Sequence, residues 1–243
     1  MKKPCLSTNK RKVYSRKRTG EPHHVNAVII VSGLPRSGTS MMMKMLEAGR
    51  IPILTDNVRR PDEDNPAGYY EFEKVKELQH DRSWLKKACG KAVKIVSPML
   101  EHLNVTDGYR YKIIFMLRNL DEVLASQKKM SHRLNGNNDT VSYNILKHNY
   151  SAHLEKVRHW MEHSGNIDFT YVNYSDVINA PCSVAKDIAD FLGIDLNTEK
   201  MGLVVDGSLY RNRRSRDIAP ASPQKQEPER ELILDQLMQL GYL

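Results

Sequence analysis

Short, predominantly apolar runs recur along the chain. They cover residues 25–32, 92–96 and 111–117, and a fourth segment, 168–174, alternates between apolar and polar positions. Runs that stay apolar at consecutive positions are typical of strands buried on both faces, the kind found in parallel sheets. The pattern therefore predicts four strands, at least three of them in the interior of a sheet.

Segments with the apolar spacing of helices separate these strands. They are expected at 39–48, 71–88, from about 120 to 132, 141–163 and 176–192, with a short C-terminal helix at 230–240. Asn119 is well placed to cap the third of them, and Gly193 to end the fifth. Strands that alternate with helices imply βαβ units. The expected fold class is α/β, with a mostly parallel central sheet and helices on both faces.

The formal net charge of +8 is concentrated at the N-terminus. Residues 1–24 contain eight Lys or Arg and one acid, so the rest of the chain is close to neutral. A basic segment with few apolar residues is expected to be a disordered tail, and 25–243 to form a single domain. The tail could make weak contacts with nucleic acid or an anionic membrane surface, although plain solvation is the simpler expectation.

Targeting and redox features are sparse. No apolar run precedes Val25, which argues against a signal peptide or N-terminal anchor, and no stretch approaches the roughly 18 residues of a membrane-spanning helix. The three cysteines, Cys5, Cys89 and Cys182, are scattered and have no metal-ligand spacing. These features predict free thiols in a reducing compartment and a cytoplasmic location, without a metal site.

A glycine-containing loop, GLPRSGTS at 33–40, joins the first strand to the first helix. Gly33 and Gly38 have the spacing of a phosphate-binding loop, in which unpaired N–H groups at a helix N-terminus hold an anion. Thr39 stands where nucleotide hydrolases carry lysine; the hydroxyls of Thr39 and Ser40 are kept, and Arg36 supplies a cation earlier in the loop. A tight turn without a ligand is the alternative, which the Arg-Ser-Gly-Thr-Ser sequence disfavours. The loop makes a three-layer, phosphate-loop-like fold the expected architecture.

Four segments together resemble the sulfotransferase family. The loop resembles that family's 5′-phosphosulfate loop, MLRNLDEVLASQ resembles its 3′-phosphate motif, and VNYSDVINAP followed by IADFLGIDL and then LYRNRRS resemble its later segments. The resemblance implies transfer of a sulfuryl group from 3′-phosphoadenosine-5′-phosphosulfate, without a metal. The donor-binding residues that it implies are Arg36, Ser37, Gly38, Thr39, Ser40, Arg118, Ser126, Tyr174, Arg211, Arg213 and Arg214.

The same resemblance implies catalytic candidates. In KAVKIVSPML, Lys94 matches the family lysine that contacts the sulfuryl group, but Val96 stands where many members carry a histidine base. Glu71 resembles the glutamate of bacterial members, and Asp56 resembles in its spacing the acid of the tyrosyl-protein branch. A carboxylate acts as a base at neutral pH when partial burial raises its pKa. Glu71 is favoured over Asp56, and both stay open.

Two other functions compete with sulfuryl transfer. A phosphate-loop kinase or nucleotidase would use ATP with magnesium, but the missing loop lysine argues against it. A non-enzymatic protein could bind nucleic acid or a membrane surface through its basic tail. The sequence leaves the acceptor, a hydroxyl or an amine, and the oligomeric state undetermined, because loops such as 56–68 and 133–139 set specificity in folds of this kind.

Overall fold

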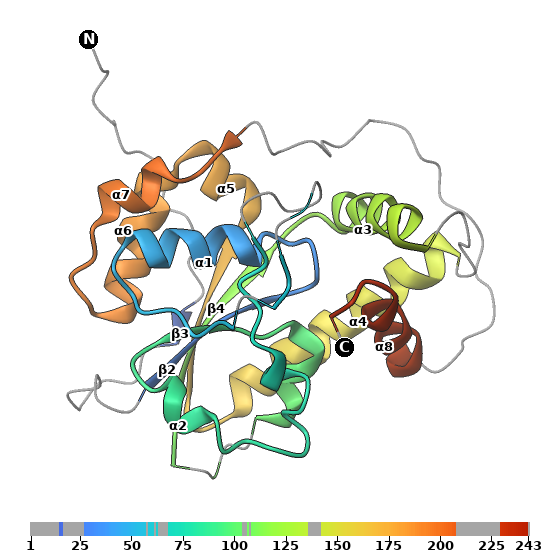
Figure 1. Cartoon of the computed structure of the whole chain (residues 1–243), viewed down its shortest axis with the longest axis horizontal. Coiled ribbons are helices and arrows are strands. Elements are labelled where there is room, and N and C mark those ends of the chain that lie inside the picture. Colours follow the sequence, from blue (N-terminus) through green and yellow to red (C-terminus); the bar gives the residue numbers. More distant parts are fainter. Residues whose placement is uncertain are drawn as a thin grey trace.

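The centre of the protein is a twisted β-sheet between two layers of helices (Figure 1). The structure is a computed structural model, and it describes residues 15–16, 27–56, 58–60, 62, 68–103, 106, 108–135, 142–207 and 229–242. Within this part the sheet has five strands in the order β1-β5-β4-β2-β3. The strands are β1 (Ser15–Arg16), β2 (Ala27–Gly33), β3 (Ala92–Lys94), β4 (Arg110–Leu117) and β5 (Ile167–Asn173).

The four predicted strands are confirmed, and they run parallel. Every residue of β2 is buried, as expected of an apolar run at the middle of a parallel sheet. β2 lies between β3 and β4. Because all three strands are parallel, their carboxyl ends reach the same edge of the sheet. The loop after β2, Lys94 at the end of β3 and Arg118 just after β4 are thereby brought to that edge.

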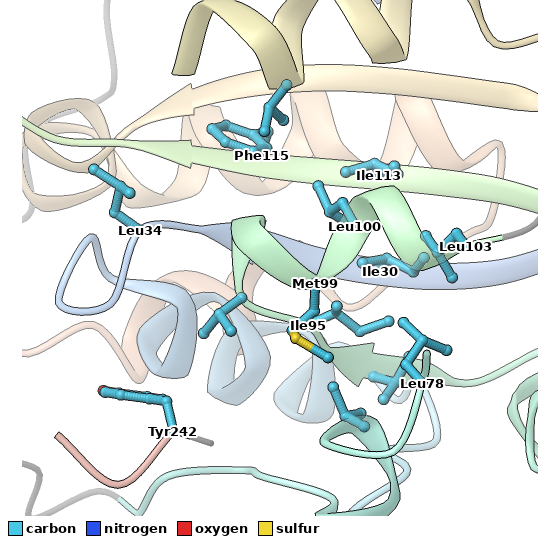
Figure 2. Packing of buried hydrophobic residues seen from close by; sticks show 14 of the residues in the cluster. Ile30, Leu34, Leu78, Ile95, Met99, Leu100, Leu103, Ile113, Phe115 and Tyr242 are labelled. Atoms are coloured by element: carbon cyan, nitrogen blue, oxygen red, sulfur yellow. The ribbon is translucent and has the colours of Figure 1, made fainter. Parts of the chain in front are cut away.

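The helices cover both faces of the sheet, which confirms the predicted α/β class. They are α1 (Thr39–Ala48), η1 (Glu73–Val75), α2 (Leu85–Ala88), η2 (Ser97–His102), α3 (Leu120–Asn135), α4 (Tyr143–His163), α5 (Tyr174–Asn179), α6 (Pro181–Leu192), α7 (Thr198–Leu203) and α8 (Glu229–Gln239). One apolar cluster joins the sheet to α1, α6 and α7. A second joins it to η2, α3, α4 and α8, and Figure 2 shows Ile30, Ile113 and Phe115 of the sheet in this second cluster.

The predicted helix at 71–88 is wrong. The segment contains only the short helices η1 and α2, joined by turns. Asp81 interrupts it, because its carboxylate accepts a hydrogen bond from the Ser83 amide at 2.8 Å, a local bond that competes with helix formation. The apolar positions on which the prediction rested, Val75, Leu78 and Trp84 among them, are nevertheless buried. The spacing of these residues therefore predicted their burial correctly but their secondary structure incorrectly.

Helix ends follow local chemistry. The Asn119 side chain accepts hydrogen bonds from the amides of Asp121 at 2.9 Å and Glu122 at 3.4 Å, so the predicted cap of α3 is confirmed. The predicted helix at 176–192 is divided into α5 and α6, because Pro181 lacks the N–H that a continuous helix requires. Gly193 ends α6 in the left-handed conformation, as expected.

The N-terminal segment is described at two residues only. Ser15 and Arg16 form β1, which pairs antiparallel with β5 at Thr170 and Phe169. The other residues of the predicted basic tail lie outside the described part. Among the helices that the structure describes, none combines the length and the hydrophobicity needed to span a membrane.

Candidate functional site at the carboxyl edge of the sheet

The glycine loop is packed so tightly that its glycines cannot be replaced without displacement of neighbours. Gly33 has φ 145°, and a Cβ there would lie 2.5 Å from the Ser37 hydroxyl and 2.7 Å from the Met116 carbonyl oxygen. Gly38 has φ 102°, and a Cβ there would lie 2.5 Å from the Tyr174 ring. Both backbone angles also disfavour any side chain. The spacing seen in the sequence therefore reflects a real steric requirement.

The loop presents the features of an anion site. Gly38 is the N-cap of α1; no side chain in the described part of the chain caps this end of the helix, and its first turn, which begins with Thr39 and Ser40, carries no acid. The Ser37 hydroxyl is buried and has no hydrogen-bond partner within the described structure. A buried hydroxyl without a partner is costly unless a ligand satisfies it. The loop residues therefore fit a bound phosphate or sulfate group.

Arg36 joins the loop to the two residues predicted to hold the 3′-phosphate. Its backbone has φ 73°, a strained conformation for a residue with a side chain. Its Nε donates to the Ser126 hydroxyl at 3.1 Å, and its carbonyl oxygen accepts a hydrogen bond from Arg118 Nη1 at 3.0 Å. The structure thus brings Arg36, Arg118 and Ser126 together from three separate segments.

Arg118 is held in place from two further sides. Its Nε donates to the Glu122 carboxylate at 3.0 Å, and both side chains are only 8% exposed. Its guanidinium carbon lies 4.2 Å from the centre of the Tyr174 ring. Burial raises the pKa of Tyr174, while the Arg118 charge opposes this shift. Tyr174 is thus packed between Gly38 of the loop and Arg118.

A second group of charges lies beside the loop. Lys94 Nζ donates to the Glu71 carboxylate at 3.1 Å, and its side chain is only 1% exposed. Arg59 pairs with the same carboxylate at 3.3 Å. Burial lowers the pKa of Lys94, and the Glu71 carboxylate opposes that effect. Sequence analysis predicted Lys94 and Glu71 but missed Arg59, because nothing in its surface-loop sequence distinguishes it.

One carbonyl oxygen connects the two groups. The Tyr69 carbonyl accepts hydrogen bonds from Lys94 Nζ at 2.7 Å and from the Ser40 hydroxyl at 3.2 Å. Ser40 lies in the first turn of α1, so this carbonyl ties the helix N-terminus to the lysine and its carboxylate. The loop and the Lys94–Glu71 pair therefore form one continuous site.

Asp56 occupies a different position from Glu71. It is exposed, and its carboxylate accepts hydrogen bonds from the Glu73 amide at 2.6 Å and the Val58 amide at 3.2 Å. Its own amide donates to the Glu71 carbonyl at 3.3 Å. In this arrangement Asp56 caps η1 and holds the backbone of Glu71.

Three predicted residues cannot be placed. Arg211, Arg213 and Arg214 lie outside the described residues. Sequence analysis also missed Tyr242, which is buried beside Lys94 and Arg59. Its only sequence signal is Gly241, a typical helix-ending residue, immediately before it. Within the described ranges, no group of three or more His, Cys, Asp or Glu could hold a metal ion.

A helix N-terminus that no described side chain caps, after a parallel strand and next to a buried cation–carboxylate pair, is typical of phosphate-loop proteins that transfer groups. Comparison of the sequence with family models identifies the protein family. The model described as "Sulfotransferase domain" matches residues 26–232, and the chain belongs to this family. No curated protein sequence matches the chain.

Solved structures of low sequence identity are similar to this chain. The sulfotransferase domain of the Synechococcus PCC 7002 olefin synthase is 15% identical, with a TM-score of 0.50, over 93% of this chain and 97% of that one. The mouse sulfotransferase SULT7A1, solved in complex with PAP, is 18% identical, with a TM-score of 0.48, over 80% of this chain and 69% of that one. The sulfotransferase domain from the curacin biosynthetic pathway is 14% identical, with a TM-score of 0.47, over 88% of this chain and 98% of that one.

Proposed function

We propose that this protein transfers a sulfuryl group from 3′-phosphoadenosine-5′-phosphosulfate to an acceptor hydroxyl or amine. The observation that carries the proposal is a lysine-free phosphate loop joined through the Tyr69 carbonyl to a buried Lys94–Glu71 pair. In this loop the Ser37 hydroxyl is buried and has no partner among the described residues. A sulfuryl donor has no γ-phosphate for a loop lysine to reach. Membership of the sulfotransferase family favours this reaction over that of a phosphate-loop kinase.

The donor would lie along the loop and across the ends of β2 and β4. The segment 36–40 would hold the 5′-phosphate with amides, hydroxyls and the Arg36 guanidinium. Arg118 and Ser126, which both contact Arg36, would hold the 3′-phosphate, since an arginine fork matches phosphate geometry. Tyr174 would support the nucleotide beside Arg118, and the arginines at 211, 213 and 214 would add positive charge to the same phosphate.

The donor supplies an activated sulfuryl group on a phosphate leaving group. Lys94 would place its charge near the oxygen at which negative charge develops, and its burial makes that charge more effective than it would be in water. Glu71 would take the proton from the acceptor. Its contacts with Lys94 and Arg59 fix its orientation at the edge of the loop.

Glu71 and Asp56 can be separated experimentally. Glu71→Gln is expected to lower the release of adenosine 3′,5′-bisphosphate, with simple phenols, alcohols and amines as acceptors, by about a hundredfold. Its affinity for the bisphosphate should stay within about twofold, because the donor contacts lie elsewhere. Asp56→Asn is the matched control and should keep most of the activity. An active Glu71→Gln enzyme together with an inactive Asp56→Asn enzyme would indicate that Asp56, and not Glu71, accepts the proton.

A further inference from the structure

The C-terminal end of the described chain turns back into the protein. After α8, Gly241 adopts φ 73°, the left-handed conformation that ends many helices. The Tyr242 amide donates to the Leu237 carbonyl at 2.9 Å, and the Gly241 amide donates to the Met238 carbonyl at 3.0 Å. These two bonds form a Schellman motif, which redirects the chain sharply. Tyr242 consequently points inward and is only 8% exposed.

Arg59 fastens this turn to the site. Its Nη1 donates to the Gly241 carbonyl at 3.3 Å, and its Nη2 donates to the Leu240 carbonyl at 3.1 Å. The same guanidinium pairs with Glu71 and lies 3.8 Å from the centre of the Tyr69 ring. A single side chain therefore links the end of the chain to the carboxylate proposed to accept the proton.

Tyr242 lies against the group of charges formed by Lys94, Glu71 and Arg59. Lys94 Nζ lies 5.4 Å from the centre of its ring, within the range of a cation–π interaction. The Arg59 guanidinium carbon lies 5.1 Å from the same ring centre. Figure 2 shows the ring at the edge of the apolar cluster, apart from the other labelled side chains. Tyr242 thus lies beside both cations that hold the Glu71 carboxylate.

We propose that Tyr242 is a positioning residue for sulfuryl transfer, which holds Lys94 and Arg59 beside Glu71 and keeps water away from them with its ring. The inference rests on the proposed function and extends it to a residue from the far end of the chain. Water competes with any acceptor for a sulfuryl group, so a ring that excludes water favours transfer over hydrolysis of the donor. The side chain acts through Lys94 and Arg59 and takes no part in bond formation.

Two variants separate the hydroxyl from the ring in the full-length protein. Tyr242→Phe keeps the ring, so donor hydrolysis without an added acceptor and affinity for adenosine 3′,5′-bisphosphate should both stay at the wild-type level. Tyr242→Ala removes the ring as well, and acceptor-independent hydrolysis should rise roughly tenfold. Tyr111→Phe is the matched control, since Tyr111 is fully buried at the opposite end of β4. Its donor hydrolysis and its affinity for the bisphosphate should both be unchanged.

A pH profile distinguishes positioning from simple loss of packing. The charged groups around Lys94 are Glu71, Arg59 and Arg36, and burial by its surroundings lowers its pKa. Water admitted by Tyr242→Ala should raise that pKa, so the alkaline fall in activity should move to higher pH. Tyr242→Phe should keep the wild-type profile.

Three results bear on the inference. A rise in donor hydrolysis confined to Tyr242→Ala, with unchanged thermal unfolding in Tyr242→Phe, would support it. Wild-type behaviour of both variants, or equal hydrolysis in the two, would overturn it. Failure of the wild-type protein to bind the bisphosphate at all would overturn the proposed function, and the role of Tyr242 with it.

Discussion

The two halves of the site are built in different ways. The glycine loop half is made mainly of backbone, from a segment that is continuous in sequence between β2 and α1, and its shape depends on Gly33 and Gly38. The Lys94–Glu71 half is made of side chains that come from distant segments, with Arg59 and Tyr242 beside them. Backbone sites depend on steric fit, whereas side-chain clusters depend on charge balance and burial. The two halves should therefore fail in different ways when they are mutated.

The largest expected effect is in the backbone half. Gly38→Ala should lower the free energy of unfolding by about 2–3 kcal/mol and abolish binding of adenosine 3′,5′-bisphosphate, because the new Cβ meets the Tyr174 ring at 2.5 Å and φ is 102°. Chemical denaturation and calorimetry would measure the two effects. Gly165→Ala is the control, since a Cβ there meets nothing within 4 Å. Normal binding by Gly38→Ala would show that the loop is not under the steric constraint described.

The side-chain half should lose activity rather than binding. Lys94→Met keeps the apolar stem but removes the charge near the reacting group, so turnover should fall about a hundredfold while bisphosphate affinity changes little. Steady-state release of the bisphosphate and calorimetric titration would separate the two quantities. Lys91→Met, a neighbouring lysine outside the site, is the control. An equal loss of affinity and turnover would place Lys94 in the donor-binding half instead.

The smallest effect concerns the pH dependence of stability. The folded protein lowers the pKa of Lys94 below its ordinary value of 10.5, so above that lowered pKa the unfolded chain binds more protons than the folded protein. The contribution of Lys94 to stability should therefore rise with pH between the lowered pKa and about 10.5. The difference in unfolding free energy between the wild-type protein and Lys94→Met, measured across this range, should follow that rise. A difference independent of pH would contradict it.

The contrast between the halves also explains what the sequence could predict. Strands and the glycine loop were predictable because burial and steric constraints act on neighbouring residues, as in the apolar β2 followed by Gly33 and Gly38. The failure at 71–88 came from Asp81, whose local hydrogen bond competes with the helix. Arg59 and Tyr242 were missed because their roles arise only when the loop after α1 and the turn after α8 meet in three dimensions.

Calorimetric titration with adenosine 3′,5′-bisphosphate, compared with ATP and magnesium, tests the central claim most directly. We expect the bisphosphate to bind with a dissociation constant of about 1 μM or lower, a chelator to leave binding unchanged, and Arg118→Ala to abolish it. The thermal unfolding of Arg118→Ala serves as the check on folding, because the change leaves Glu122 without its ion-pair partner. Magnesium-dependent binding of ATP, without binding of the bisphosphate, would contradict the account and favour a phosphate-loop kinase.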